Sequence, residues 1–370
     1  MKILAVMPSY RQPDFESKVG GGEISNRMLL EGLASLGHKV KVLTWNSGNK
    51  GSGVYNGVSV IDLGKKNASI LRHVGVLLLF SSKAKEIAKK FSPDVILCCS
   101  EGLAPALKIK TVIDAPLGTF VRAFENFVNV RSFYEYGRYL LKRSIIGGYG
   151  VKDLGRSDFL LPNSEFMDRF CKSEVPFSKS TFIIYPPLDF YKMNFPEIKS
   201  VKNISMVGTS EKKGICVAEY LAERFPDITF RVLGSGKAEL EFRKKIENLK
   251  FLGWIDVKDE FENKSDAVIV PSLWQEPFGR VSIEALACGC PVFVSDIGGL
   301  PETVFQQKPL IIKTGDFDSW RNTIGDFVSN PNTYIEYAKC AASNLQKFSV
   351  RVQVKKLDTA IRAVVESKSV

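Results

Sequence analysis

The sequence predicts an α/β protein built from two Rossmann-like, doubly wound parallel-sheet domains that face each other across a cleft. Three observations lead to this prediction: a length of 370 residues, short apolar runs that alternate with helical patterns along the whole chain, and a stiff segment, Tyr185-Pro186-Pro187, near its middle. A chain of this length can bury two cores. Repeated alternation of strand and helix is typical of parallel sheets with right-handed crossovers.

The first half of the chain predicts three buried strands and one helix. The strands are the apolar runs Lys2–Val6, Lys39–Thr44 and Val95–Cys99. Between the first two, Glu23–Leu36 has apolar residues near helical spacing, and Gly37 ends the predicted helix.

After about residue 186 the alternation restarts. We predict a helix at Ile215–Phe225 and strands at Asn203–Val207, Thr229–Leu233, Ala267–Val270 and Pro291–Val294. The domains are therefore expected at 1–185 and 186–350, with a last helix over 351–370 packing back on the first domain. Ligands of such sheets bind outside the carboxyl ends of the strands, so two facing sheets would share one site.

The composition, with 45% hydrophobic and 25% charged residues, is that of an ordinary globular protein. The longest apolar stretch, Val74–Phe80, is far shorter than the roughly 20 residues that span a bilayer. The first residues predict a buried strand rather than a signal peptide. We therefore expect a cytoplasmic protein.

Cysteine and histidine content argues against disulfides and against a histidine-based metal site. The seven cysteines are scattered without a C-x-x-C pair, and only two histidines are present. We interpret the cysteines as small core residues in a reducing compartment. The net charge of +11 favours anionic partners, namely phosphates, nucleic acid or an acidic membrane surface.

Two glycine-bounded segments are candidate anion sites. Gly20-Gly21-Gly22-Glu23 lies just before the first predicted helix, where exposed amides favour an anion. It lacks the G-x-G-x-x-G dinucleotide fingerprint, and the alternative is a plain surface loop. In Gly208–Gly214, Lys213 would place a positive charge on a diphosphate at a helix start, and the alternative is a solvated lysine.

Residues 274–291 carry the strongest signal. They hold two glutamates, Glu276 and Glu284, separated by the chain break Pro277-Phe278-Gly279, and predict a helix over Arg280–Ala287. A carboxylate has two acceptor oxygens, which suit it to a vicinal diol, and amides at the break would point at phosphates. One glutamate would then hold the sugar and the other a ribose. For the glutamates alone, a helix cap and an exposed helical residue are the alternative.

Together these motifs resemble the retaining glycosyltransferases of family 4, or group 1, which have the GT-B fold. In the first half the resemblance rests on Gly20–Glu23 and Gly37-His38. In the second half it rests on Lys213-Gly214, Gly234-Ser235-Gly236, Phe251–Trp254, Pro271-Ser272, Glu276–Gly279, Glu284–Ala287 and Gly298–Glu302.

The resemblance implies a transferase that moves a sugar from a nucleoside-diphosphate sugar, such as a UDP- or GDP-sugar, to a hydroxyl of a glycan or lipid-linked acceptor. It implies retention of anomeric configuration and no cofactor. By position, Lys213 would neutralise the diphosphate and Glu276 would contact the transferred sugar, which makes these two the candidate catalytic residues. The other donor-binding residues would be Gly21, Gly22, Thr209, Gly253, Trp254, Phe278, Gly279, Arg280 and Glu284.

Two positions depart from the family pattern. Thr209 stands where the family usually has an arginine, and Arg122 stands near the place of a usual histidine. We hypothesise that Arg122, on the acceptor side, supplies the missing positive charge from across the cleft.

No metal is expected. Asp316-Phe317-Asp318 has the Asp-x-Asp form of metal-dependent transferases of another fold, but its place after Gly315 favours a solvated turn or a helix start. Three other functions stay open: a nucleotide-sugar epimerase, a non-catalytic nucleotide-binding partner subunit of a glycosyltransferase, and a nucleic-acid binder. The first lacks a visible acid–base set, and the last lacks a recognised motif, so no nucleic-acid partner is expected.

Residues 131–156 combine six basic residues with interleaved aromatic ones. The segment either lies against an anionic membrane, as a peripheral contact, or forms a solvated helix with its aromatic rings packed inward.

Overall fold

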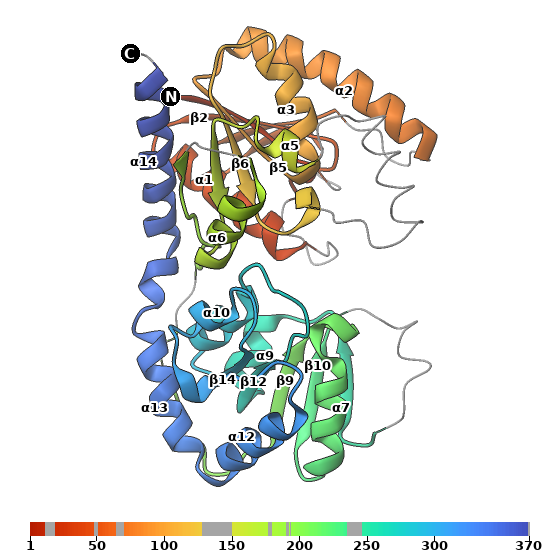
Figure 1. The fold of residues 1–370 in the computed structure, drawn as a ribbon, viewed down its shortest axis with the longest axis vertical. Coiled ribbons are helices and arrows are strands. Elements are labelled where there is room, and N and C mark those ends of the chain that lie inside the picture. The colour runs from red at the N-terminus through yellow and green to blue at the C-terminus, as the bar shows by residue number, and fades with distance from the viewer. Residues whose placement is uncertain are drawn as a thin grey trace. The chain divides into compact units, whose positions relative to one another are not determined.

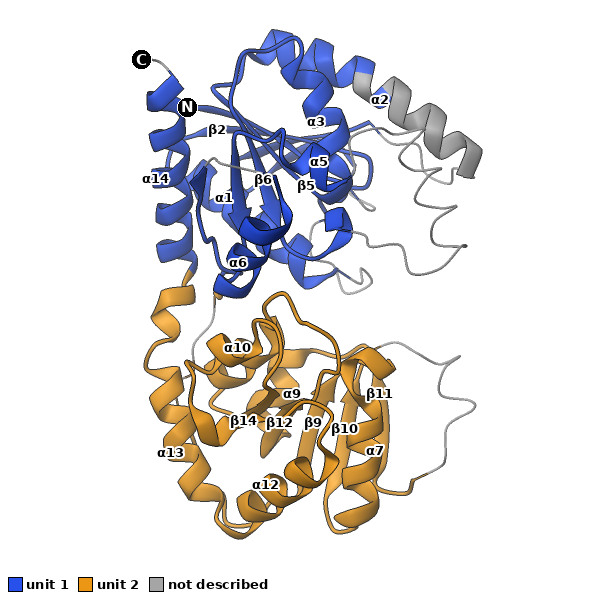
Figure 2. Ribbon diagram, viewed as in Figure 1, with its two compact units in different colours: residues 1–187, 350–370 blue, residues 188–349 orange. Residues whose placement is uncertain are grey.

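The computed structural model describes residues 1–11, 19–47, 51–63, 70–127, 150–176, 180–189, 192, 194–234 and 246–368, with only the backbone described at 70–79 and 81. The chain divides into two compact units (Figures 1 and 2). Unit 1 comprises Met1–Pro187 and Val350–Val370, and unit 2 comprises Leu188–Ser349. The first crossing between the units follows the Tyr185-Pro186-Pro187 segment.

Unit 1 contains an eight-stranded sheet in the order β3-β4-β2-β1-β5-β6-β7-β8, parallel except for β3, which is antiparallel to β4. Its strands are β1 (Lys2–Val6), β2 (Lys39–Thr44), β3 (Gly53–Tyr55), β4 (Val58–Asp62), β5 (Val95–Cys99), β6 (Leu117–Val121), β7 (Phe159–Pro162) and β8 (Ser180–Thr181). Its helices are α1 (Gly21–Ser35), α2 (Ile70–Phe91), α3 (Leu103–Lys110), α5 (Val151–Leu154), α6 (Glu165–Glu174) and α14 (Val350–Lys368), with short 3-10 turns η2 (Ser100–Gly102) and η3 (Glu125–Phe127).

Helices cover both faces of this sheet because successive side chains of a strand point to opposite faces. On β1, Ile3 joins a core cluster with residues of α1 and α14, whereas Leu4 joins a second cluster with residues of α2, α3 and α6. The packing of α14 on α1 is close, since a Cβ at Gly32 would lie 2.2 Å from Cγ2 of Val354. The last helix therefore belongs to unit 1, as Figure 2 shows.

Unit 2 contains a six-stranded parallel sheet in the order β11-β10-β9-β12-β13-β14. Its strands are β9 (Asn203–Val207), β10 (Thr229–Leu233), β11 (Leu249–Gly253), β12 (Ala267–Val270), β13 (Val292–Ser295) and β14 (Ile311–Ile312). Its helices are α7 (Ile215–Arg224), α9 (Val257–Asn263), α10 (Arg280–Ala287), α11 (Leu300–Thr303), α12 (Phe317–Ser329) and α13 (Pro331–Ala342), with 3-10 turns η4 (Glu211–Lys213), η5 (Lys308–Leu310) and η6 (Leu345–Phe348).

The two predicted parallel α/β sheets are confirmed, and most predicted strands match within a residue. The start of the first helix was wrong: α1 begins at Gly21, so Gly21 and Gly22 form its first turn and only Gly20 precedes it. The first-turn amides of a helix need no intrahelical acceptor, so glycines carry little cost there. Strand β8 comprises only Ser180–Thr181, although the Phe182 and Ile184 amides after it still donate to β7 carbonyls.

The interpretation of the cysteines as core residues holds for five of the seven. Cys216 is half-buried and Cys340 is exposed, which corrects the prediction at those two positions. Burial raises the pKa of the Cys98 and Cys171 thiols to about 12. A thiol with such a pKa stays protonated at neutral pH, so these two are packing residues rather than nucleophiles.

No helix in the described part of the chain combines the length and the apolar character needed to cross a bilayer. Of the basic and aromatic segment 131–156, residues 131–149 lie outside the described residues.

His38 ties α14 to the rest of unit 1 and makes the stability of the protein depend on pH. Its Nε2 lies 2.8 Å from Oδ1 of Asp358 on α14. Burial lowers the pKa of His38 below 6.5, and the Asp358 carboxylate opposes this shift only in part. Just below pH 6.5, His38 therefore binds more protons in the unfolded chain than in the folded protein. The contribution of His38 to stability is thus fully present above that pH and is lost as the pH falls.

We expect the urea midpoint of the wild-type protein to fall between pH 7.5 and pH 5.5 by more than that of a His38→Gln variant. Urea unfolding of both proteins at the two pH values measures this difference. An identical pH dependence in the two proteins would contradict the assignment.

Candidate functional site

Two segments of unit 2 leave adjacent strands at the point where the strand order reverses. Residues 208–213 follow β9, and residues 271–279 follow β12, the neighbour of β9 on its other side. Because the carboxyl ends of parallel strands meet at one edge, both segments lie at that edge, where doubly wound sheets bind ligands. Lys213 is in the first segment and Glu276 in the second.

Glycines hold the first segment in place. Gly208 has φ +114°, and a Cβ there would lie 2.7 Å from Cγ of Lys213, so the lysine stem packs directly on this backbone. Gly214 has φ +80°, and its Cβ would lie 1.9 Å from the carbonyl oxygen of Pro271. The two segments are also joined by a hydrogen bond of 2.9 Å from the Leu273 amide to the Lys212 carbonyl. Close backbone approach of this kind requires glycine.

Two further glycines, Gly298 and Gly299, hold the second segment, residues 271–279, in place. A Cβ at Gly298, which has φ +62°, would lie 2.3 Å from the carbonyl oxygen of Glu276. That same oxygen accepts a hydrogen bond of 2.8 Å from the Gly299 amide. The backbone of residues 271–279 is therefore held between Gly214 and Gly298-Gly299, which positions the side chain of Glu276.

The Glu276 side chain is buried and meets Lys213. The Lys213 Nζ lies 2.5 Å from Oε1 of Glu276, and the same oxygen accepts hydrogen bonds of 2.8 Å from Ser272 Oγ and 3.0 Å from Trp274 Nε1. Within the described residues, the hydrogen bonds of this carboxylate thus converge on Oε1. A carboxylate has acceptor capacity on both oxygens, so Oε2 is the atom that this arrangement offers to a ligand.

Ser272 and Trp274 were not predicted as site residues. Ser272 was noted only as part of the Pro271-Ser272 motif, and Trp274 only as the first residue of the strongest segment. Their spacing from Glu276, four and two residues, is compatible with contact in a tight loop. Only the loop conformation turns both donors toward one oxygen.

Helix α10 brings Glu284 and Arg280 together. Gly279, with φ +100°, precedes the helix, and the Arg280 Nε lies 2.5 Å from Oε1 of Glu284 one turn later. Both side chains are largely buried. The four-residue spacing could have predicted this ion pair, whereas we predicted the two residues as separate ligand contacts.

The Phe278 side chain is not available to a ligand. It is 2% exposed, and its ring packs edge-on against Phe348 at 5.4 Å between centroids. Only the main-chain atoms of Phe278 could contact a donor, which corrects the prediction of a donor contact by this residue to its backbone.

The remaining predicted residues of unit 2 lie at the ends of β9 and β11. Thr209 is buried directly after Gly208. Gly253, with φ +71°, accepts a hydrogen bond of 2.8 Å from the Gly234 amide through its carbonyl. Trp254 follows with 55% of its surface exposed. A half-exposed indole beside these strand ends is suited to stack on a base or sugar face.

In unit 1, Arg122 lies at the end of β6 beside the first turn of α1. A Cβ at Gly22 would lie 3.8 Å from Cβ of Arg122. The guanidinium donates to Asn26 Oδ1 at 3.1 Å and to the Ile184 carbonyl at 2.7 Å, and stacks on the Phe120 ring at 4.8 Å. The structure thus brings Gly22 and Arg122 together within unit 1. The hypothesis that Arg122 compensates for Thr209 stays a prediction.

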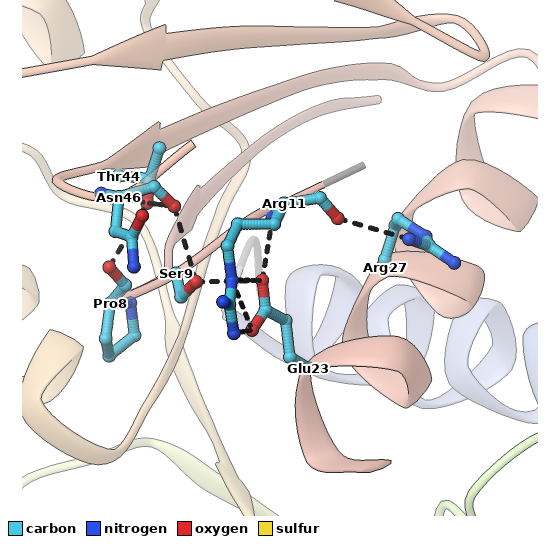
Figure 3. A network of polar contacts seen from close by, with 7 residues as sticks. All are labelled: Pro8, Ser9, Arg11, Glu23, Arg27, Thr44 and Asn46. Carbon is cyan, nitrogen blue, oxygen red and sulfur yellow. Dashed lines mark hydrogen bonds and ion pairs between the residues drawn. The ribbon is translucent and has the colours of Figure 1, made fainter. Parts of the chain in front are cut away.

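A polar network holds the segment after β1 against the start of α1 (Figure 3). The Glu23 carboxylate accepts hydrogen bonds from Arg11 Nη2 at 2.8 Å, from the Arg11 amide at 2.7 Å and from Ser9 Oγ at 2.8 Å. Arg27 donates to the Arg11 carbonyl at 3.1 Å. Sequence reasoning missed this network, because nothing in the spacing of Ser9, Arg11 and Glu23 indicates contact.

A carboxylate with a raised pKa, that of Glu125, lies at the same edge of unit 1, shortly after β6. Burial raises the pKa of Glu125, and a hydrogen bond with Ser100 opposes the shift. Ser100, directly after β5, has φ +46°, which is rare for a residue with a side chain. Neither residue was predicted from the sequence.

The Asp-x-Asp segment starts a helix, which confirms that prediction. Asp316 caps α12 by accepting a hydrogen bond of 3.0 Å from the Ser319 amide, and Asp318 accepts one of 2.9 Å from the Tyr220 hydroxyl. Among the described residues, no group of three or more His, Cys, Asp and Glu side chains is arranged to hold a metal ion.

The close approach at Gly214 leads to a stability prediction. Gly214→Ala should lower the free energy of unfolding by about 2 kcal/mol or more, because a positive φ costs roughly 1–2 kcal/mol for a residue with Cβ and the clash with Pro271 adds to it. Gly315→Ala is the matched control, since Gly315 has φ +73° with open space around its Cβ position. Urea unfolding measures both variants, and equal destabilisation would contradict the proposed close approach.

The two parallel α/β sheets define a class of protein when they are compared with solved structures. Sucrose-phosphate synthase from Thermosynechococcus elongatus matches with a TM-score of 0.78 at 18% identity, covering 99% of this chain and 100% of that one. Anabaena HepE in complex with UDP and glucose matches with a TM-score of 0.73 at 18% identity, covering 98% and 100%. The fold is therefore GT-B, that of a large class of glycosyltransferases.

The family follows from the sequence. The model of Glycosyltransferase Family 4 matches residues 19–190, and that of Glycosyl transferases group 1 matches residues 206–344. An uncharacterized 42.6 kDa protein in the cps region of Klebsiella pneumoniae is 26% identical over 82% of this chain and 87% of its own length. The chain belongs to the group 1, family 4 glycosyltransferases of GT-B fold.

Proposed function

We propose that this glycosyltransferase moves a hexosyl group from a nucleoside-diphosphate sugar, a UDP- or GDP-sugar, to an acceptor hydroxyl with retention of anomeric configuration and without a metal ion. The observation that carries the proposal is the contact of 2.5 Å between Lys213 and Glu276 at the strand-order reversal of unit 2. A cation, and a carboxylate whose Oε2 lies outside the hydrogen bonds made by Oε1, match the two ends of such a donor, its diphosphate and its sugar.

In the proposed reaction, negative charge grows on the leaving diphosphate as its bond to the sugar breaks. Lys213 stabilises that charge, and the amides at the start of α10 add a favourable partial positive charge. Glu276 Oε2 accepts a hydrogen bond from a sugar hydroxyl and orients the ring. Because Glu276 is committed to Lys213, Ser272 and Trp274 through Oε1, we assign it to binding and not to nucleophilic attack.

The rest of the donor site follows from the same strand ends. Glu284 would hold the ribose hydroxyls, with Arg280 fixing the orientation of its carboxylate across 2.5 Å. Gly253 and Trp254 would contact the base, and Thr209 and the backbone of Phe278 and Gly279 would line the site. In unit 1, Gly21, Gly22 and Arg122 would contact the phosphates and the acceptor side.

The relatives support the biological setting that we propose. One lies in a cps region, and one solved neighbour is a complex with UDP and glucose. We propose that this chain acts in the synthesis of a glycan, polysaccharide or glycolipid, in the cytoplasm and at the membrane surface where a lipid-linked acceptor would be found.

Two measurements test the proposal. Thermal-shift screening against a panel of UDP- and GDP-sugars should identify a donor, since a ligand at 100 times its dissociation constant stabilises by about 2.7 kcal/mol. Proton NMR of the first product should then show the anomeric configuration of the donor, with turnover unchanged by EDTA. An inverted product or activity lost with EDTA would refute the corresponding part of the proposal.

The purified chain must also turn over alone. Sugar transfer without any second protein separates the enzyme from a non-catalytic partner subunit. Product analysis without acceptor separates it from an epimerase, which would release an isomerised donor.

A further inference from the structure

A groove of about 700 Å³ lies on unit 1. It runs between α6, the edge strand β8 with the residues that follow it, and α14. This volume is in the range of pockets that accommodate small ligands. No residue of the groove belongs to the proposed donor or acceptor site.

The groove has an apolar lining and a basic border. Apolar surface comes from the residues that follow β8 and from α14, namely Phe182, Ile183, Val352, Ala360 and Ala363. Ala360 and Ala363 are three residues apart on α14, so they share one face of that helix. Small side chains there leave room along the helix for an extended apolar chain.

Three lysines border this apolar surface, and two of them lack a carboxylate partner. Lys172 is balanced by Asp168, whose carboxylate lies 2.7 Å from the Lys172 Nζ and 2.6 Å from Thr181 Oγ1. Lys355 and Lys356 on α14 are exposed and, within the described residues, make no ion pair. The Lys356 Nζ lies 5.9 Å from the centre of the Tyr185 ring. The border therefore carries uncompensated positive charge.

A peptide that adds a strand to this edge does not fit. Phe182 and Ile184 already donate to β7, and the Tyr185 amide donates to Gln353 Oε1 at 2.9 Å. Among residues 182–185, only the Ile183 amide is then left to pair with an added strand. One residue is too short an edge for strand addition. Covering helices and lysines are known protections of sheet edges, but protection alone does not require an open apolar groove.

An apolar channel bordered by unpaired lysines complements an amphiphile with a negative head. We infer that the groove between α6, β8 and α14 is a docking site for an anionic phospholipid of a bilayer, with an acyl chain against Ile183 and Ala360 and the phosphate beside Lys355 and Lys356. The net charge of +11 acts in the same direction by drawing the protein to anionic surfaces. This inference does not depend on the transfer reaction.

Vesicle flotation tests it without donor or acceptor. The wild-type protein should float with vesicles of equal parts phosphatidylcholine and phosphatidylglycerol and not with pure phosphatidylcholine, and less so at high salt. Lys355→Gln/Lys356→Gln should lower the partition coefficient on the order of 30-fold, from about 1 kcal/mol for each lysine near an anionic surface. Lys83→Gln/Lys89→Gln, which removes the same charge from exposed positions of α2, is the matched control and should change binding far less.

A separate variant tests the apolar lining of the groove. Ala363→Glu puts a carboxylate in the groove at an exposed helix position and should weaken flotation as much as the double lysine variant. Ser367→Glu adds the same charge to α14 outside the groove and should not. Melting temperatures of all variants should match that of the wild type.

Three results would overturn the inference. The first is wild-type binding that is absent or is equal on neutral and anionic vesicles. The second is equal loss in the groove variants and their controls, which would indicate general electrostatic attraction. The third is a change in molar mass by light scattering when Lys355 and Lys356 are replaced, which would make the groove a contact between copies of the chain.

Discussion

Lys213→Ala should lower kcat by 10²- to 10³-fold, with a smaller change in the donor KM. The physical reason is that the lysine charge stabilises the leaving diphosphate more as the sugar–phosphate bond breaks than in the ground state, and removing one such stabilising group typically costs this much. Steady-state kinetics with the donor identified by thermal shift measures the effect.

The neighbouring lysine provides the matched control. Lys212 is exposed, and the contact that it makes to the second segment is through its carbonyl, which Lys212→Ala retains. This variant should keep near wild-type kinetics. A loss below tenfold in Lys213→Ala, or an equal loss in Lys212→Ala, would remove Lys213 from the proposed mechanism.

Glu276→Gln should lower kcat/KM on the order of 10²-fold, because the neutral amide weakens both the contact with Lys213 and the hydrogen bond that a sugar hydroxyl donates at the position of Oε2. Glu276→Ala should in addition lower the free energy of unfolding by about 2 kcal/mol, since Lys213, Ser272 and Trp274 then lose a charged acceptor. Kinetics and urea unfolding of the two variants measure these effects separately.

A second buried glutamate of unit 2 separates activity from stability. Glu260 is fully buried and pairs with Arg231 at 2.5 Å, outside the proposed site. Glu260→Gln should destabilise unit 2 while leaving kcat per folded molecule unchanged. If both glutamine variants lost activity in proportion to their stability, the role assigned to Glu276 would be wrong.

Local patterns were sufficient where the signal is local. The helix over Arg280–Ala287 was predicted with its observed bounds, because Gly279 begins it and a glycine and a proline follow it in the chain. The start of α1 was misjudged because glycines favour loops by propensity, whereas the first helical turn tolerates them. Strand β11 and helix α9 were not predicted, because their apolar patterns are short and irregular.

The site shows the same division. The sequence identified Lys213, Glu276 and Glu284 as candidates through glycine-bounded segments and a family resemblance. We predicted Arg280 and Glu284 as separate contacts, although their four-residue spacing on α10 could have indicated the ion pair. The sequence did not indicate that the Phe278 ring lies in the core, because this depends on Phe348, a packing partner that is distant in the chain.

By itself, the sequence determined the two parallel α/β sheets, the positions of most strands and the family, because alternating apolar runs and glycine positions are encoded residue by residue. Only the tertiary structure decided which side chains meet. Lys213 and Glu276 are 63 residues apart, and their contact exists because β9 and β12 are neighbours in the sheet and Gly214 lets their following segments touch. The lysine-bordered groove likewise joins residues 168–184 to 352–363, and no local pattern specifies a pairing over such a distance.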